Sequence, residues 1–95
     1  MQEHNTKEIR AAARQLDNIA DQLQTLRSSG IVRISKSAKP LKGDTANAIQ
    51  DRLEALTSDI LALKKGVDQC AADLYEYARR LDIADEKAKT LIASK

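Results

Sequence analysis

The feature that most constrains this chain is a long apolar stripe in its second half. Successive positions spaced alternately three and four residues apart are all apolar; they are Ala46, Ile49, Leu53, Leu56, Ile60, Leu63, Val67, Cys70, Leu74, Tyr77, Leu81, Ala84, Ala88 and Leu91. This spacing is typical of a helix that lies against other helices. A second stripe with the same spacing is formed by Ile9, Ala12, Leu16, Ile19, Leu23 and Leu26. The sequence therefore predicts an all-α interaction protein.

The two stripes predict a two-helix antiparallel hairpin with a long second helix, assembling into a helical bundle. The chain is short enough for a single domain spanning residues 1–95. Asn5 and Glu8 have the spacing of a capping box at the start of the first helix. Gly66 weakens the second helix, which is nevertheless expected to continue because the stripe keeps its phase. The expected elements are a first helix over about 5–28, a basic loop over 29–43 and a second helix over about 45–92.

The predicted helices differ in length, and this difference has a functional consequence. A first helix ending near Ser28 would cover only the N-terminal half of the second. The uncovered positions would be Cys70, Leu74, Tyr77, Leu81 and Leu91, which we interpret as a partner-binding seam. The alternative is a self-sufficient monomer whose first helix continues through Ile34.

Composition excludes several function classes. One histidine, His4, and one cysteine, Cys70, cannot supply a usual metal-ligand set, and the chain has neither a Gly-rich phosphate loop nor the Glu-x-x-His motif of di-iron bundles. We therefore predict no enzymatic activity, no catalytic or metal-binding residues and no cofactor. Cys70 lies on the apolar stripe and is expected to be a buried small hydrophobe. No apolar run is long enough to span a membrane.

Positive charge is concentrated between the two helices, although the net charge is only +2. Arg33, Lys36, Lys39 and Lys42 lie in a stretch without acids and form a possible anion-binding loop. The loop has no aromatic residue for base stacking and no helical basic face, which argues against nucleic acid as a partner. A solvated loop is the simpler interpretation.

Leu41-Lys42-Gly43 lies near the centre of the chain and is followed by Ala46, Ala48 and Ile49. A helical hairpin of this length with a central L-x-G turn resembles the WXG/LXG superfamily of type VII secretion proteins. The chain has no tryptophan and is closer to the LXG branch. It is too short to carry a toxin and looks like a small WXG-like partner of an LXG toxin. The resemblance implies a helical adaptor that dimerises or binds an LXG-type targeting domain to promote its export.

Members of that family also carry a C-terminal export signal, an aromatic residue followed four positions later by an acid. Leu81 and Asp85 fit this signal by position, with leucine in place of the aromatic residue. Helical spacing puts the two on one face, one turn apart. The alternative is that Leu81 belongs to the apolar stripe and Asp85 is a surface residue. The protein is thus either a cytoplasmic adaptor or one exported without a cleaved signal peptide, since the polar N-terminus has no hydrophobic signal core.

The sequence is therefore compatible with three functions. The first is a type VII secretion substrate or adaptor, acting as a homodimer or as a heteromer with another helical or LXG-domain protein. The second is a nucleic-acid or anionic-surface binder that uses the basic loop. The third is a plain homodimeric coiled-coil scaffold.

Overall fold

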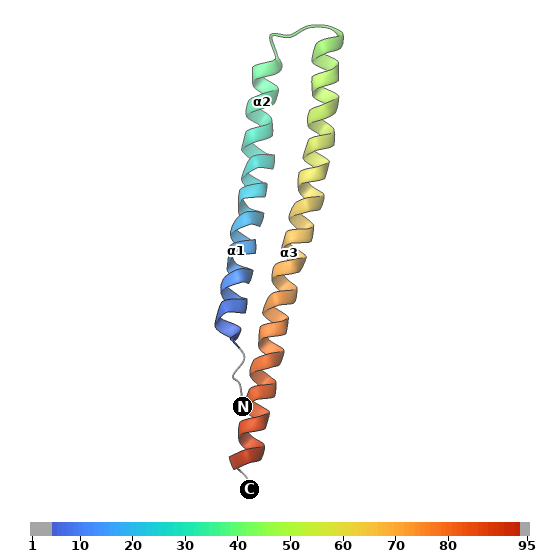
Figure 1. Ribbon diagram of the computed structural model, residues 1–95. Coiled ribbons are helices and arrows are strands. Elements are labelled where there is room, and N and C mark those ends of the chain that lie inside the picture. Colours follow the sequence, from blue (N-terminus) through green and yellow to red (C-terminus); the bar gives the residue numbers. More distant parts are fainter. Residues whose placement is uncertain (1–4, 94–95) are drawn as a thin grey trace.

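Two antiparallel helical rods joined by a tight turn make up the protein (Figure 1). The structure is a computed structural model and describes residues 5–93. The first rod consists of α1 (Thr6–Thr25), η1 (Leu26–Gly30) and α2 (Ile31–Ala38), and the second is α3 (Asp44–Ala93). The predicted all-α hairpin with a long second helix is confirmed. Its extents of 79 × 15 × 15 Å describe a rod rather than a globule.

Local sequence signals explain where the rods begin and how they turn. The side chain of Asn5 accepts a hydrogen bond of 3.2 Å from the backbone N–H of Glu8, which is the predicted N-cap. Pro40 ends the first rod because it has no N–H to continue the helix. Gly43 then adopts a positive φ of 69°, a left-handed conformation that favours glycine, and α3 starts at the next residue. α3 passes through Gly66 without interruption, as predicted.

The first rod is longer than predicted, so the expected helix end near 28 and the loop over 29–43 are wrong. Helix continues to Ala38, Lys39 keeps helical angles, and the connection is confined to residues 39–43. The Ser28-Ser29-Gly30 sequence does not end the helix, because it is absorbed into the π-helical turn η1. A π-turn holds one residue more than an α-helical turn. The inner stripe therefore continues from Leu23 to Ile31 over eight residues instead of seven.

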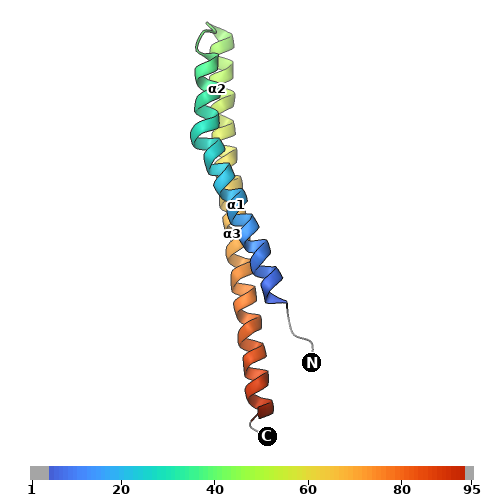
Figure 2. The ribbon, with the colours of Figure 1, turned by 90° about the vertical axis from the view of Figure 1, so that its left-hand side faces the viewer.

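The hairpin core is small and is composed mainly of alanine. The fully or nearly buried apolar residues of the described chain are Ala13, Ala20, Ile31, Leu53, Ile60, Ala71 and Ala78. The larger ones are grouped near the turn, where Ile31, Leu53 and Ile60 form one cluster with Leu23 and Ile49 packed against it. The alanines lie in the other half, towards the chain ends. Figure 2 shows α1 crossing α3. The small side chains of the buried alanines permit a close approach of two helices.

Candidate helix-packing interface

The side of α3 that carries the apolar stripe has a central line and two flanks, and the first rod covers only one of the flanks. The central line consists of Leu53, Ile60, Val67, Leu74 and Leu81, all buried or half-buried. The flank turned towards the first rod consists of Thr57, Lys64, Ala71 and Ala78. The flank turned away from it consists of Leu56, Leu63, Cys70 and Tyr77, all exposed. The hairpin thus covers the smaller and more polar flank, burying its alanines and half-burying Thr57 and Lys64, and leaves the larger apolar flank in solvent.

The first rod repeats this arrangement. Its buried alanines, Ala13 and Ala20, lie on one side of its stripe, while Ile19 and Leu26 on the other side are 43% and 44% exposed. Ala12, seven residues before Ile19, is exposed as well.

Two side-chain pairs show that the exposed flanks of the two rods lie on the same face of the hairpin. Nη2 of Arg10 donates a 2.6 Å hydrogen bond to Oδ2 of Asp82, and Oη of Tyr75 donates one of 3.0 Å to Oδ2 of Asp17. On each rod the buried stripe separates these polar residues from the exposed apolar flank. Because the polar flanks meet on one face, the apolar flanks share the opposite face. We call this surface the apolar face; it comprises Ile19, Leu26, Leu56, Leu63, Cys70 and Tyr77.

The predicted partner-binding seam is divided between the interior and the apolar face. Leu74 and Leu81 are half-buried on the side of the first rod, whereas Cys70, Tyr77 and Leu91 are exposed. The expectation that all five lack an intrachain neighbour because the first helix is too short is wrong: the rod reaches from Ala38 to Thr6, so Arg10 is level with Asp82. The expectation that Cys70 is buried is also wrong for this chain alone. Cys70 and Tyr77 are exposed because of the flank they occupy, whereas Leu91 lies beyond the level at which the first rod begins (Figure 1).

The exposed surface of the molecule is large for its mass. Its accessible surface is 7347 Å², whereas a compact monomer of 10.5 kDa exposes about 5,400 Å². Its radius of gyration is 22.0 Å, against about 12 Å for a compact chain of this length. Single exposed leucines are ordinary, but a long face of leucine, isoleucine and tyrosine marks a packing surface.

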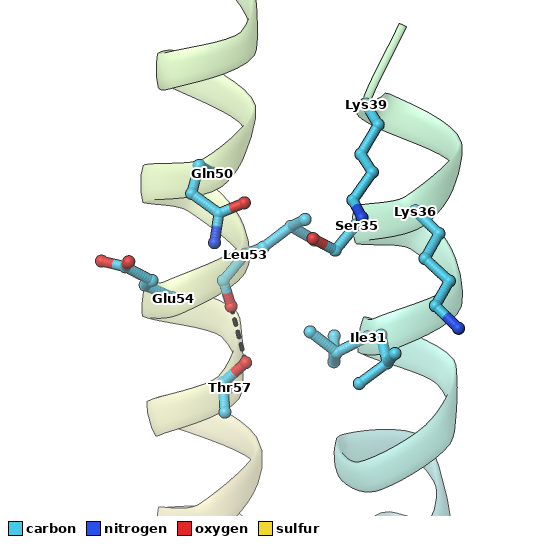
Figure 3. A pocket seen from close by; sticks show the side chains of 9 residues that line it. Ile31, Ser35, Lys36, Lys39, Gln50, Leu53, Glu54 and Thr57 are labelled. Carbon is cyan, nitrogen blue, oxygen red and sulfur yellow. Dashed lines mark hydrogen bonds between the residues drawn. The ribbon is translucent and has the colours of Figure 1, made fainter.

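The predicted basic loop is mostly helical. Arg33 and Lys36 lie on α2, and Lys42 is in the turn. Lys36 and Lys39 line a groove of about 340 Å³ between α2 and α3, together with Ile31, Val32, Ser35, Gln50, Leu53, Glu54 and Thr57. Figure 3 shows Leu53 directed towards Ser35 across the groove, while Lys36 extends away from α3. The structure therefore brings two of the four predicted basic residues to the groove and leaves Arg33 and Lys42 outside its lining.

The perturbed titratable groups are paired on helix surfaces. Hydrogen bonds from Arg79 and then Arg80 lower the pKa of Glu76 to about 2. A hydrogen bond from Arg10 lowers the pKa of the Asp82 carboxyl below its usual value. Partial desolvation and the hydrogen bond to Asp17 raise the pKa of Tyr75. None of these groups lies in an enclosed cleft, so the shifts report ion pairing and cross-rod contacts rather than an acid–base site.

The remaining predicted site residues lie on α3 and in the turn. Leu81 and Asp85 are both half-buried on α3, one turn apart. Leu41, Lys42 and Gly43 form part of the turn. His4 lies outside the described residues. Within residues 5–93, no group of three or more His, Cys, Asp or Glu side chains is placed to hold a metal ion. No helix in that range combines the length and apolar character needed to cross a membrane.

A scan against protein-family models and searches of curated proteins and of solved structures give no match. The function is therefore inferred from the geometry of the apolar face and from the residues of the turn.

Proposed function

We propose that this protein is a non-enzymatic helical adaptor of type VII secretion, which packs its apolar face against the helices of another chain. The observation that carries the proposal is the apolar face itself. The hairpin buries Ala71 and Ala78, covers Thr57 and Lys64 in part, and leaves Leu63 and Tyr77 more than half exposed. Water is excluded from such a face only when another helical surface covers it. Aliphatic and aromatic side chains at helical spacing are well suited to packing against another helix.

The turn supports the secretion part of the proposal. Leu41-Lys42-Gly43 forms the connection between the rods, and Gly43 has the left-handed conformation that reverses the chain. Small residues and an aliphatic stripe follow it, as in the LXG branch. The proposed occupants of the apolar face are a second copy of the chain or the helical targeting domain of an LXG-type toxin, and the bound toxin would be the export cargo.

Leu63 and Ser58 offer a matched pair of variants for testing this proposal. Leu63 lies on the apolar face, whereas Ser58 is exposed on the other side of α3, little more than one turn away. Leu63→Glu places a charge in the proposed interface, and Ser58→Glu adds the same charge outside it. The tagged wild type and both variants would be recovered from the native cells after nuclease treatment, and the bound proteins identified by mass spectrometry.

We expect the wild type and Ser58→Glu to recover an LXG-domain protein and Leu63→Glu to lose it, with unchanged helicity by circular dichroism. Recovery of no secretion-related protein by the wild type would contradict the proposal. Recovery of the same toxin by Leu63→Glu would exclude the apolar face as its docking surface.

The groove at the turn supports a second candidate, an anion-binding end. The sequence suggested no helical basic face, but α2 is helical and carries Arg33 and Lys36, and Lys39 follows at its end. Phosphate-rich ligands would then bind with a strong salt dependence. Binding to a fluorescent oligonucleotide across a salt series tests this, with Lys36→Gln and Lys39→Gln together as the variant. Binding that is insensitive to salt, or unchanged in the variant, would remove this candidate.

A further inference from the structure

The turn end of the hairpin carries positive charge that no carboxylate of the described chain neutralises. Residues 31–43 contain four cations and no acid, and all four cations are exposed; they are Arg33, Lys36, Lys39 and Lys42. Within residues 5–93 none of them is part of an ion pair, whereas Arg10, Arg79 and Arg80 are each paired with a carboxylate. The next acid along the chain is Asp44 in the first turn of α3, where the helix N-terminus offsets its charge. The turn end therefore presents charge of one sign to its surroundings.

Two exposed aliphatic residues lie among these charges. Val32 is 48% exposed and Leu41 is 45% exposed. Val32 lines the groove between α2 and α3, and Leu41 lines a neighbouring groove. The two grooves share Ser35, Lys39 and Gln50, so they form one continuous surface. We call this surface the turn patch; its exposed basic and aliphatic members are Val32, Lys36, Lys39 and Leu41.

The turn patch and the apolar face lie on opposite sides of the hairpin. Thr57 lines the groove, and it belongs to the flank of α3 that lies across the central line from Leu56 and Leu63. Figure 3 shows Lys36 extending away from α3 and Glu54 directed away from α2. Figure 1 shows the turn at one end of the molecule, which is 79 Å long. The patch can therefore contact a flat surface while the apolar face stays open to a protein partner.

We propose that the turn patch binds the surface of a membrane that contains anionic lipids. Its lysines lie at the level of the lipid phosphates, and its two aliphatic residues enter the boundary between headgroups and acyl chains. The proposal rests on the anion-binding end given above as the second candidate function, because it names the source of the phosphate. Clustered basic residues are attracted to an anionic leaflet, and aliphatic side chains lose contact with water when they enter its boundary.

The aliphatic residues favour a membrane over a nucleic acid. A protein that follows a single-stranded phosphate backbone combines its cations with aromatic side chains that stack on the bases. The two aromatic residues of this chain, Tyr75 and Tyr77, lie in the other half of α3. Val32 and Leu41 cannot stack on bases, whereas a lipid boundary accommodates exposed aliphatic side chains next to cations.

Vesicle binding tests the charged part of the patch. Cosedimentation is measured with vesicles of phosphatidylcholine and phosphatidylglycerol in equal parts, and with vesicles of phosphatidylcholine alone. We expect the wild type to bind only the mixed vesicles and to bind them less as salt is raised. Lys36→Gln combined with Lys39→Gln should lower the partition coefficient by on the order of tenfold. Lys87→Gln combined with Lys89→Gln removes the same charge from exposed positions near the other end of α3 and should change it little.

A second pair of variants tests the aliphatic part. Leu41→Ser should lower the partition coefficient on mixed vesicles by about threefold to tenfold, because it removes apolar area that leaves water on binding. Ile92→Ser is the control, since Ile92 is 66% exposed near the other end of α3. Circular dichroism checks that every variant keeps the helicity of the wild type.

Equal binding to both kinds of vesicle, or binding to neither, would overturn the proposal. Equal losses in the two lysine pairs, or unchanged binding by Leu41→Ser, would also overturn it. An oligonucleotide bound by a protein that does not bind the mixed vesicles would assign the anion-binding end to nucleic acid instead.

These outcomes are separate from failure of the secretion role. A protein that binds the mixed vesicles through the turn patch but recovers no LXG-domain protein supports the membrane contact and contradicts the secretion role. A protein that recovers an LXG-domain protein but binds no vesicles contradicts only the membrane contact.

Discussion

The two halves of the hairpin bury different kinds of side chain. Near the turn, Ile31, Leu53 and Ile60 form a cluster of large aliphatic residues. Towards the chain ends, the residues with almost no exposure are Ala13, Ala20, Ala71 and Ala78. Large aliphatic side chains remove much apolar area from water, whereas alanine removes little but lets helices approach closely. The turn half thus holds itself together, and the alanine half depends more on whatever covers its exposed flanks.

A polar boundary separates the two halves. Arg27 lies in η1, next to the aliphatic cluster along the chain, and its Nε is buried without a hydrogen-bond partner in the described structure. Such a group destabilises the fold, because its N–H has left water without compensation. The π-helical turn at the same place shifts the phase of the first rod by one residue.

The largest effect should come from the aliphatic cluster. We expect Leu53→Ala to lower the free energy of unfolding by about 2–5 kcal/mol, because it removes a buried leucine and leaves a cavity. Leu74→Ala in the other half should cost less, since Leu74 is only half-buried within the hairpin. Urea unfolding followed by circular dichroism measures both values, and equal losses would contradict the difference between the halves.

The alanine half should instead be sensitive to added volume. Ala71 is 1% exposed, so Ala71→Leu should force the helices apart and cost about 1–3 kcal/mol of unfolding free energy. Its neighbour Ala72 is exposed, and Ala72→Leu should leave the stability nearly unchanged. Thermal and urea unfolding of the two variants provide the comparison. A tolerated Ala71→Leu would mean that close approach is not what the alanines provide.

At the polar boundary, substitution should raise the free energy of unfolding instead of lowering it. Arg27→Met keeps an extended apolar side chain and removes the unpaired Nε, so we expect a gain of about 1 kcal/mol in unfolding free energy. Arg14, which is exposed, provides the control, because Arg14→Met removes a solvated charge and should change little. If Arg27→Met lost stability, the guanidinium would be making a stabilising contact.

Deleting one residue should distinguish the π-turn from the regular helix. Removing exposed Ser29 restores seven-residue spacing between Leu23 and Ile31, so the same side chains stay inside. We expect a stability change of no more than about 0.5 kcal/mol, as for most surface changes. Removing exposed Gln15 should instead rotate the start of α1 and displace Ala13 from the interface. The melting temperatures of the two deletion variants show which loses more stability. Equal losses would contradict the idea that the π-turn accommodates one extra residue in the first rod.

The smallest effect should be the acid dependence of the cross-rod ion pair. Arg10 lowers the pKa of Asp82 in the folded chain, so folding favours the charged carboxylate. The resulting stabilisation is complete above the unfolded pKa and is lost as pH falls through the lower, folded pKa. We expect the difference in unfolding free energy between the wild type and Asp82→Asn to become smaller in acid. Urea unfolding of both proteins at neutral and acidic pH tests this. A difference in unfolding free energy that does not depend on pH would contradict it.

Local signals in the sequence predicted much of the hairpin. The Asn5 cap, the reversal at Gly43 and the passage of α3 through Gly66 each depend on a residue's own backbone preferences or on its near neighbours. The end of the first helix was mispredicted, because Ser28-Ser29-Gly30 resembles a helix end. In the structure a π-turn, supported by the contact of Ile31 with α3, carries the helix past it.

The sequence by itself determined that two amphipathic helices form and which positions of α3 share its apolar stripe, because spacing along a helix fixes which residues share a face. It did not determine which flank of that line turns inward. The two flanks are Leu56, Leu63, Cys70 and Tyr77 on one side, and Thr57, Lys64, Ala71 and Ala78 on the other. Only the tertiary structure decided this. Ala71 and Ala78 of α3 are almost fully buried, as are Ala13 and Ala20 of α1. Their burial comes from packing between segments more than 50 positions apart, which no local pattern specifies, and this packing leaves the larger apolar flank facing outward.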